Sequence, residues 1–469
     1  MRRPIIAACF SMLIAATAFA GAKITIHNTD DPSVGLNDPT PADPVGGNSG
    51  KTLGEQRMVA LEKAADIWSK LIDSSVEIVI DVKFRSLTPC DSSSGVLASA
   101  GPTHTVANFN NAPKQDVWYP IALANRFAKT HLSPDADISA NFNLDVDNAT
   151  CLGSTSWYYG LDDKHGTNID MVTVALHEFA HGLGISGTYN SRTGALFQGK
   201  PNVFELHTFD DSLGLRWDQL TDAQRLTSQT NDQNLVWDGE RSRLRGDEVL
   251  GPTPFMRING TEYRVGKASF GGPIAVAGFS GTIAAATDES NDAGVSTTDA
   301  CTALTNAPAI TGRIALIDRG NCTFVVKAKN AQVAGAIGVI IVDNLVASSP
   351  ISLGGSDASV AIPVVSVTKS DGDSLRAQLP SGVFAVFGAD PTRLSGADKA
   401  GNIKLYAPAT FSGGSSVYHW DTSAFPNLLM EPSINSDLTH SVDITLDQLV
   451  DIGWTEPAAA GRQRLRRSQ

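Results

Sequence analysis

The chain has 469 residues, of which 42% are hydrophobic and 18% are charged, and its formal net charge at pH 7 is −13. This length allows two or three domains with buried cores of their own, and the composition is that of a folded protein rather than a disordered one. Because the chain is acidic, we do not expect nucleic acid or an anionic membrane as its partner.

The first twenty residues have the three parts of a secretory signal peptide. Arg2 and Arg3 precede an apolar run from Ile5 to Ala18, and Ala18-Phe19-Ala20 forms a small-residue cleavage site. The apolar run is too short to cross about 30 Å of hydrocarbon as a transmembrane anchor. We therefore expect a mature protein that begins near Gly21 and is secreted or periplasmic, without stable insertion in a membrane.

The region after the signal peptide has the pattern of an α/β protein. Lys23 to His27 alternates like a short strand, and Val76 to Phe84 alternates like a strand with one buried face. Between them, Thr52 and Glu55 are placed to cap an amphipathic helix. A further strand is predicted from Asp137 to Asp145. This strand is either interior or lies at the edge of a cleft, where it would pair with an extended substrate.

Four cysteines remain once the signal peptide is removed: Cys90, Cys151, Cys301 and Cys322. An even number in an exported chain indicates two disulfides. Three pairings are possible, and nearness in sequence together with the domain boundaries proposed below favours Cys90 with Cys151 and Cys301 with Cys322. The spacing contains no C-x-x-C, so a zinc site built from cysteines is not expected.

The segment MVTVALHEFAHGLGISG, from Met171 to Gly187, contains His177, Glu178 and His181 in H-E-x-x-H order. On a helix the two histidines lie on one face, so that both imidazoles can bind one metal ion. A zinc ion with an open position activates water, and the adjacent glutamate can take the proton as that water attacks a peptide carbonyl.

Zinc requires a third protein ligand, which the motif itself does not supply. Three glycines soon after His181 are expected to end the helix. Glu205 is one candidate, and it would lie on a second helix from Pro201 to Asp211, although the glycine stop argues against that arrangement. The downstream candidates are Glu205, His207, His419 and His440.

Two segments together resemble the metzincin family of zinc proteases. VALHEFAHGLG is similar to the metzincin helix, whose pattern H-E-x-x-H-x-x-G-x-x-H matches at Gly184 but has a third histidine where this chain has Gly187. SSVYHWDTSAFPNLLMEP resembles the leishmanolysin branch, in which a long insertion precedes that histidine. The resemblance implies that His419 is the third zinc ligand and that Met430 forms the turn beneath the metal.

The metzincin resemblance covers roughly residues 23–250 and 391–455, and DITLDQLVDIGW at 443–454 is similar to the last helix of the family. The chain departs from the family pattern in two respects. No propeptide cysteine switch precedes Thr52, and the insertion is long enough to hold a whole domain.

Between about Gly251 and Ala389 charge becomes sparse, and short runs of Val, Ile and Ala alternate with Gly-rich turns. Residues 311–344 have the periodicity of a βαβ unit with a helix from Phe324 to Ala334 and a continuously apolar second strand. RGNCTFVVKAKNAQVAGAIGVIIVDN and IPVVSVTKSDGDSL resemble the protease-associated (PA) domain. That resemblance implies a domain without catalytic residues that guides or restricts the access of substrates.

We therefore predict an α/β and α+β multidomain protein in which a metzincin-like protease domain, with a mixed sheet and an active-site helix, is split by a PA domain of βαβ type. We expect His177, His181 and His419 to bind Zn²⁺ and Glu178 to act as general base on protein or peptide substrates. The alternative is a catalytically silent PA-domain protein that binds protein partners. The predicted segments are a signal peptide (1–20), the N-terminal part of the protease domain (21–250), the PA domain (251–389), the C-terminal part of the protease domain (390–457) and a basic tail (458–469).

Overall fold

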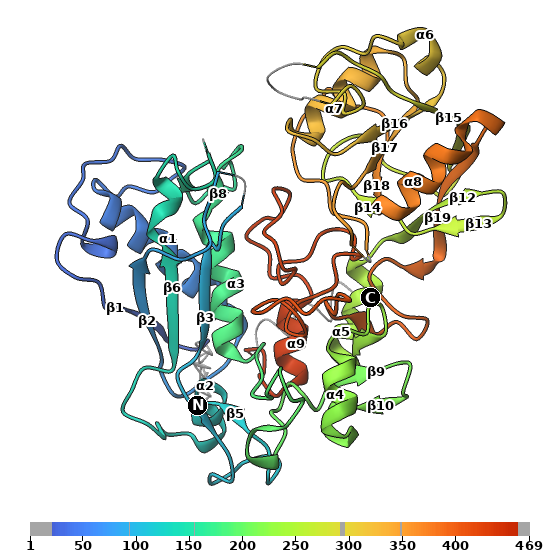
Figure 1. Cartoon of the computed structure of the whole chain (residues 1–469). Helices are drawn as coiled ribbons and strands as arrows, with labels where there is room; N and C mark the ends of the chain where they lie inside the picture. The colour runs from blue at the N-terminus through green and yellow to red at the C-terminus, as the bar shows by residue number, and fades with distance from the viewer. Residues whose placement is uncertain (1–20, 93, 154, 291–295, 348, 458–469) are drawn as a thin grey trace, which may run out of the picture.

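The computed structural model describes residues 21–457 except 93, 154, 291–295 and 348 (Figure 1). The predicted signal peptide and basic tail lie outside these residues. Within the described ranges, no helix is long and apolar enough to cross a membrane. Figure 1 shows the N-terminal sheet on one side, the large sheet of residues 252–394 at the upper right, and the C-terminal segment between them.

The N-terminal part is built on a four-stranded sheet in the order β1-β2-β6-β3. Strands β1, β2 and β6 are parallel, whereas β3 runs antiparallel to β6 and lies at the edge of the sheet. The strand predicted at 137–145 is therefore the interior strand β6, and the edge position belongs to β3. The bounds are Ile24–Asn28 (β1), Ile78–Arg85 (β2), Ala98–Pro102 (β3) and Ile138–Asn143 (β6).

Two helices, α1 (Leu53–Leu71) and α3 (Met171–Leu183), pack against each other and against this sheet. The predicted cap of α1 is present, because the side chain of Thr52 accepts a hydrogen bond from the backbone N–H of Glu55. The indole of Trp68 on α1 donates to the carbonyl of Leu176 on α3 at 3.1 Å. Helix α3 is thus fixed between α1 and the edge strand β3, which it also contacts.

A second, small antiparallel sheet has the order β10-β9-β11-β20, in which β11 precedes the large sheet in sequence and β20 follows it. Its strands are Thr208–Asp210 (β9), Leu215–Arg216 (β10), Leu235–Trp237 (β11) and Ile403–Lys404 (β20). The helices of this part are α2 (Ile121–Ala128), α4 (Asp222–Ser228), α5 (Glu240–Val249) and α9 (Thr445–Asp451). The expected last helix is thus shorter than the run at 443–454.

The helix considered for Pro201 to Asp211 does not form, and this stretch consists of turns followed by β9. The side chain of Asn202 accepts a hydrogen bond from the N–H of Phe204, and the carboxylate of Glu205 accepts one from the N–H of Asn202. Such local side-chain to backbone bonds compete with helix formation.

The large sheet has eight strands in the order β13-β12-β19-β15-β16-β17-β18-β14, and β15 to β18 are mutually parallel. Strand β16, helix α7 (Phe324–Val333) and strand β17 form the predicted βαβ unit, and every residue of β17 is buried. Two further helices are α6 (Ala307–Ile310) and α8 (Lys369–Gln378). The strands are Pro252–Ile258 (β12), Thr261–Tyr263 (β13), Gly266–Lys267 (β14), Phe279–Ala285 (β15), Ile314–Asp318 (β16), Gly338–Val342 (β17), Val364–Val367 (β18) and Phe384–Leu394 (β19).

The two ends of this large sheet meet. Pro252 pairs with Leu394, and the N–H of Ser395 donates to the carbonyl of Gly251 at 2.8 Å. Strand β19 therefore runs beyond the predicted boundary at 389, as far as Leu394. Adjacent ends are what a domain needs to lie within a surface loop of another domain.

Both predicted disulfides, Cys90–Cys151 and Cys301–Cys322, are confirmed. The first joins the segment after β2 to the segment that precedes α3, and the second lies within the region of the large sheet. The remaining short strands are Thr105–Val106 (β4), Tyr119–Pro120 (β5), Trp157–Tyr158 (β7) and Ile169–Asp170 (β8).

Candidate metal centre and catalytic site

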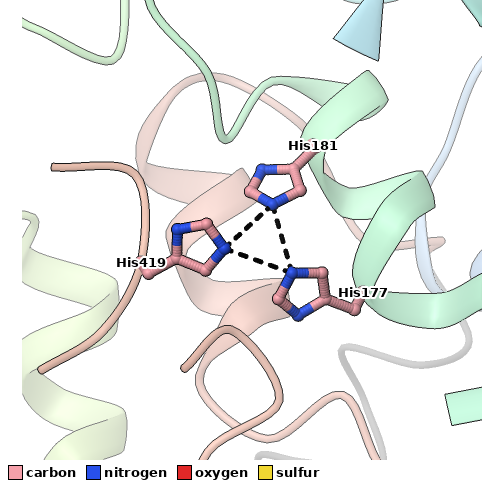
Figure 2. A group of neighbouring side chains, drawn as sticks. All are labelled: His177, His181 and His419. Carbon is pink, nitrogen blue, oxygen red and sulfur yellow. Dashed lines mark hydrogen bonds between the residues drawn. The ribbon is translucent and has the colours of Figure 1, made fainter. Parts of the chain in front are cut away.

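Three imidazoles converge at the C-terminal half of α3 (Figure 2). His177 and His181 come from one face of the helix, and His419 comes from the loop after β20. Each pair of Nε2 atoms is 3.2 Å apart. The structure thus brings the two histidines of the motif together with His419, which follows the large sheet in the sequence.

Helix α3 has a defined start and a defined end. The carboxylate of Asp170 accepts a hydrogen bond from the N–H of Thr173 at 2.7 Å, and His440 Nε2 lies 3.0 Å from the same carboxylate oxygen. The helix ends at Leu183, because Gly184 adopts a φ of +139° that side chains disfavour. The chain therefore turns away directly after His181, as the glycines predict.

The loop that carries His419 approaches this turn closely. A side chain at Gly187 would place its Cβ 2.2 Å from the hydroxyl oxygen of Tyr418, the residue just before His419. Gly187 stands where the metzincin pattern has its third histidine. The space that a side chain at 187 would need is therefore taken by the segment that delivers His419.

The second nitrogen of each imidazole is held by a backbone carbonyl. The Nδ1 atoms of His177, His181 and His419 lie 2.7, 2.7 and 2.8 Å from the carbonyl oxygens of Leu429, Ile185 and Ser415. Because a carbonyl only accepts, each Nδ1 carries the proton, and each Nε2 presents a lone pair to the other two. The three Nε2 lone pairs face one another with no hydrogen-bond donor among the three, so a single cation can be bound by all of them.

Burial and mutual repulsion keep these imidazoles neutral. Burial, with a contribution from His181, lowers the pKa of His177 to about 3. Burial likewise lowers the pKa of His181, and burial together with the other two imidazoles lowers that of His419 well below its usual value. Neutral imidazole is the form that binds metal ions.

The spacing of the nitrogens fits zinc. Three ligand atoms about 2.0–2.1 Å from a tetrahedral zinc ion are about 3.3 Å from one another, and the observed separation is 3.2 Å. Three histidines leave the fourth position free, which is the arrangement of catalytic rather than structural zinc sites.

The other candidate ligands are bonded elsewhere and lie outside this group. Glu205 is buried and accepts hydrogen bonds from the N–H groups of Thr188, Tyr189 and Asn202. His207 lies 3.4 Å from Asp238, and His440 lies between Asp163 and Asp170. Of the four candidates that the sequence leaves open, His419 is the one that lies with His177 and His181 among the described residues.

Glu178 lies next to His177 on α3, and its side chain is buried against β3. Its Oε2 atom has no hydrogen-bond partner among the described residues. Burial raises the pKa of Glu178 to about 8, opposed by a hydrogen bond from the backbone of Ala100 in β3. The carboxyl can therefore take up and release a proton near neutral pH, and a neighbouring cation would favour its ionised form.

Met430 is fully buried, and its carbonyl accepts a hydrogen bond from the N–H of Trp420 at 2.7 Å. The preceding residue, Leu429, supplies the carbonyl that orients His177. The turn that contains Met430 thus contacts the backbone next to His419 and the imidazole of His177.

The carbonyl groups that orient the imidazoles could not be predicted from the sequence, because every residue has a backbone carbonyl and no residue type marks these contacts. Asp170 stands before an apolar helical run and could have been recognised as an N-cap, whereas nothing in the sequence marks His440 as its partner.

Acidification is expected to destabilise the protein when metal is removed by a chelator. The pKa of His177 is lower in the folded chain than the value of about 6.5 in the unfolded chain, so the unfolded chain binds more protons below that value. The free energy of unfolding should therefore fall as the pH decreases through 6.5. His177 alone should contribute about 2 kcal/mol between pH 7 and pH 5.

Urea denaturation at the two pH values, with EDTA present, measures this effect. His177→Gln should reduce the difference between pH 7 and pH 5, whereas His131→Gln, which replaces an exposed histidine, should not. An equal pH dependence in the native protein and His177→Gln would contradict the assignment of a buried neutral imidazole.

Comparison with known proteins supports one part of this architecture directly. Residues 277–375 match the PA domain family, and residues 47–209, which include His177 and His181, match the family described as SPBPB7E8-like. The chain thus carries a PA domain at residues 277–375, within the segment predicted for it. Below, the name PA domain refers to the whole large sheet and its helices, including strands β12, β13, β14 and β19, which lie outside the matched residues.

The similar curated proteins include peptidases. The chain is 48% identical over 67 residues to Aminopeptidase YwaD of Bacillus subtilis (14% of this chain and 15% of that protein). It is 44% identical over 69 residues to the probable lipoprotein aminopeptidase LpqL of Mycobacterium tuberculosis (15% of this chain and 14% of that protein). These matches span less than a fifth of either relative.

Among solved structures, a zinc aminopeptidase from Bacillus subtilis is 28% identical over 30% of each chain, with a TM-score of 0.24. A peptidase M28 precursor from Shewanella amazonensis is 19% identical over 30% of this chain and 35% of that one, with a TM-score of 0.22.

Proposed function

We propose that this protein is an exported zinc-dependent endopeptidase of metzincin type that hydrolyses peptide bonds in protein substrates. The observation that carries the proposal is the convergence of three neutral imidazoles, with Nε2 atoms 3.2 Å apart, beside the buried carboxyl of Glu178. The short matches to peptidases, two of which are named as aminopeptidases, support a peptide substrate. The pattern of the first twenty residues supports export.

In this proposal His177, His181 and His419 hold the zinc ion through Nε2, and the carbonyls of Leu429, Ile185 and Ser415 keep each ring oriented. Zinc supplies Lewis-acid polarisation of the substrate carbonyl and lowers the pKa of water at the site. Glu178 takes a proton from the attacking water and passes it to the leaving amine. The free Oε2 atom of Glu178 is available for that proton.

The edge strand β3 is the proposed docking site for the substrate backbone. Among the described residues it pairs with β6 alone, on one side, and it contacts α3; the backbone of Ala100 reaches Glu178. An extended peptide that pairs with the other side of β3 would run past the site, with substrate residues both before and after the peptide bond next to Glu178. This arrangement favours cleavage within a chain over removal of a terminal residue.

Aminopeptidase activity is the second candidate, because the relatives YwaD and LpqL are named as aminopeptidases. An unfolded protein substrate and a peptide with an acetylated N-terminus distinguish the two activities. An endopeptidase cleaves both, whereas an aminopeptidase cleaves neither internal bonds nor the blocked peptide. Failure to cleave these substrates and the same peptide with a free N-terminus, with zinc bound, would favour the silent PA-domain protein that binds partners.

Removal of the metal is expected to reduce hydrolysis to background, because no other group at the site replaces the Lewis acid. Dialysis against EDTA followed by addition of about one equivalent of Zn²⁺ should restore the activity. Cleavage that persists after complete removal of zinc, verified by elemental analysis, would rule out the proposed mechanism.

A further inference from the structure

An arginine of the PA domain, Arg264, contacts the segment that carries His419. Arg264, in the turn between β13 and β14, places Nη1 2.9 Å from Asp232 Oδ2 and Nη2 3.7 Å from Asp421 Oδ1. Asp421 is buried and follows His419 by two residues. Ser349 of the PA domain donates to the same oxygen of Asp232 at 2.9 Å. The PA domain is thus bonded to the rest of the chain at points other than its two ends.

A second cation of the PA domain is buried at the same junction. Lys267 lies in β14, where backbone pairing with Val365 fixes its position. Its Nζ lies 4.9 Å from the centroid of the Phe425 ring and has no hydrogen-bond partner among the described residues. No ion pair within 4.0 Å joins this ammonium to a carboxylate of the described residues, but the charges of Glu431, Asp421 and Asp437 oppose the lowering of its pKa by burial. A buried ammonium is costly unless opposite charges lie nearby, so these acids explain why Lys267 is tolerated.

Two of the acids near these cations, Asp421 and Glu431, belong to the loop of the third ligand and to the methionine turn. Glu431, directly after Met430, is buried, and its Oε1 accepts a hydrogen bond from the N–H of Leu428 at 3.0 Å. Its carboxylate therefore closes the turn whose Leu429 carbonyl orients His177. Asp421 Oδ1 accepts from the N–H of Ser423 and from Gln233, which fixes the chain just after His419.

Two links lead from these cations to the zinc ligands. Arg264 is linked through Asp421 to the backbone just after His419, and the charge of Lys267 acts on Glu431, which closes the turn whose Leu429 carbonyl orients His177. Without the two cations, two buried carboxylates would repel each other and draw in water. The turn and the loop would then lose their fixed positions.

We propose that Arg264 and Lys267 are positioning residues for the zinc site, so that the PA domain braces the third-ligand loop and the methionine turn from outside the protease domain. This inference rests on the proposed zinc function. It assigns the PA domain a role in metal binding, in addition to the guidance of substrates that its family resemblance implies.

The test measures the dissociation constant for zinc in the full-length mature chain, by competition with a chromophoric chelator. Arg264→Gln and Lys267→Met should each weaken zinc binding about tenfold, the lower range for the loss of groups that support metal ligands. Arg264→Lys keeps a positive charge beside Asp232 and Asp421 and should bind zinc within about twofold of the native protein. The matched control is Lys369→Met, since in the part of the chain that the structure describes Lys369 on α8 forms one ion pair, an exposed one with Asp373.

Arg264 is the safer site for this test because its side chain is 31% exposed and lines a cavity of about 820 Å³ between the PA domain and the rest of the chain. If Lys267→Met does not fold, the zinc affinities of Arg264→Gln and Arg264→Lys still test whether the PA domain supports the zinc site. A second variant pair tests the charge coupling: Lys267→Met with Glu431→Gln should bind zinc more tightly than Lys267→Met alone, because the unpaired buried acid is gone.

Hydrogen exchange gives a readout that does not depend on activity. In Arg264→Gln the amides of 419–431 should exchange faster, while those of α1 should not change. Native zinc affinity in Arg264→Gln and Lys267→Met, or equal weakening in Lys369→Met, would overturn the brace. Absence of zinc binding by the native protein would instead overturn the proposed function.

Discussion

Replacement of Glu178 by glutamine is expected to abolish hydrolysis while zinc remains bound. Glutamine has nearly the same shape as glutamate but cannot take the proton of the attacking water. Loss of a general base typically costs about 10² to 10⁴ in rate, so kcat/KM on an unfolded protein substrate should fall at least about 100-fold. Elemental analysis should still find about one zinc per chain, because Glu178 is not a ligand in this site.

The matched control is Glu240→Gln, which removes the same charge from an exposed residue at the start of α5. This variant should retain full activity and zinc. Full activity in Glu178→Gln would show that another group serves as the base. Loss of zinc in Glu178→Gln would show that the carboxylate contributes to metal binding or to the structure of α3.

Features set by neighbouring residues could be predicted from the sequence. Thr52 and Glu55 indicate the start of α1, Gly184 indicates the end of α3, and the apolar run at 338–342 indicates a buried parallel strand. Each of these signals depends on residues within a few positions of one another, where backbone preference and periodicity act. The PA domain was recognisable for the same reason.

The edge strand β3 could not be predicted because its sequence, ASAGP, has no alternation of large apolar and polar residues. It becomes a strand by pairing with β6 and packing against α3, and both are long-range contacts. The alternating run at 138–143 was therefore considered for the edge, although its pairing with β2 on one side and β3 on the other places it in the interior. Strand order depends on tertiary contacts that pattern alone does not contain.

The third ligand shows the same limit at the level of the site. Pattern alone left Glu205, His207, His419 and His440 open, and only the resemblance to the leishmanolysin branch favoured His419. The geometry adds the reason, since Tyr418 fills the space beside Gly187 and the Ser415 carbonyl turns His419 towards α3. The contact between Gly187 and Tyr418 joins segments on opposite sides of the PA domain in the sequence, whereas the Ser415 carbonyl belongs to the same loop as His419.

Replacement of His419 and of Glu205 should therefore have opposite effects on metal binding and on stability. His419→Ala removes one of three imidazoles. If four ligands share the roughly 10–16 kcal/mol of a structural zinc site, one ligand is worth about 3 kcal/mol, or about 100-fold in affinity. The metal-free chain should keep its stability, because three mutually facing lone pairs contribute little to it.

Glu205→Gln should give the reverse result. Its carboxylate accepts N–H bonds from Thr188 and Tyr189 on one oxygen and from Asn202 on the other. Glutamine must turn an NH₂ group towards at least one of these donors, which should cost about 1–3 kcal/mol of unfolding free energy. Zinc titration and urea denaturation of both variants distinguish the third zinc ligand from a residue that only stabilises the fold. Weaker zinc binding in Glu205→Gln with intact binding in His419→Ala would show that Glu205, and not His419, is the third ligand. The three-histidine site requires that the affinity follow His419, because only its Nε2 atom lies within 3.2 Å of both helical imidazoles.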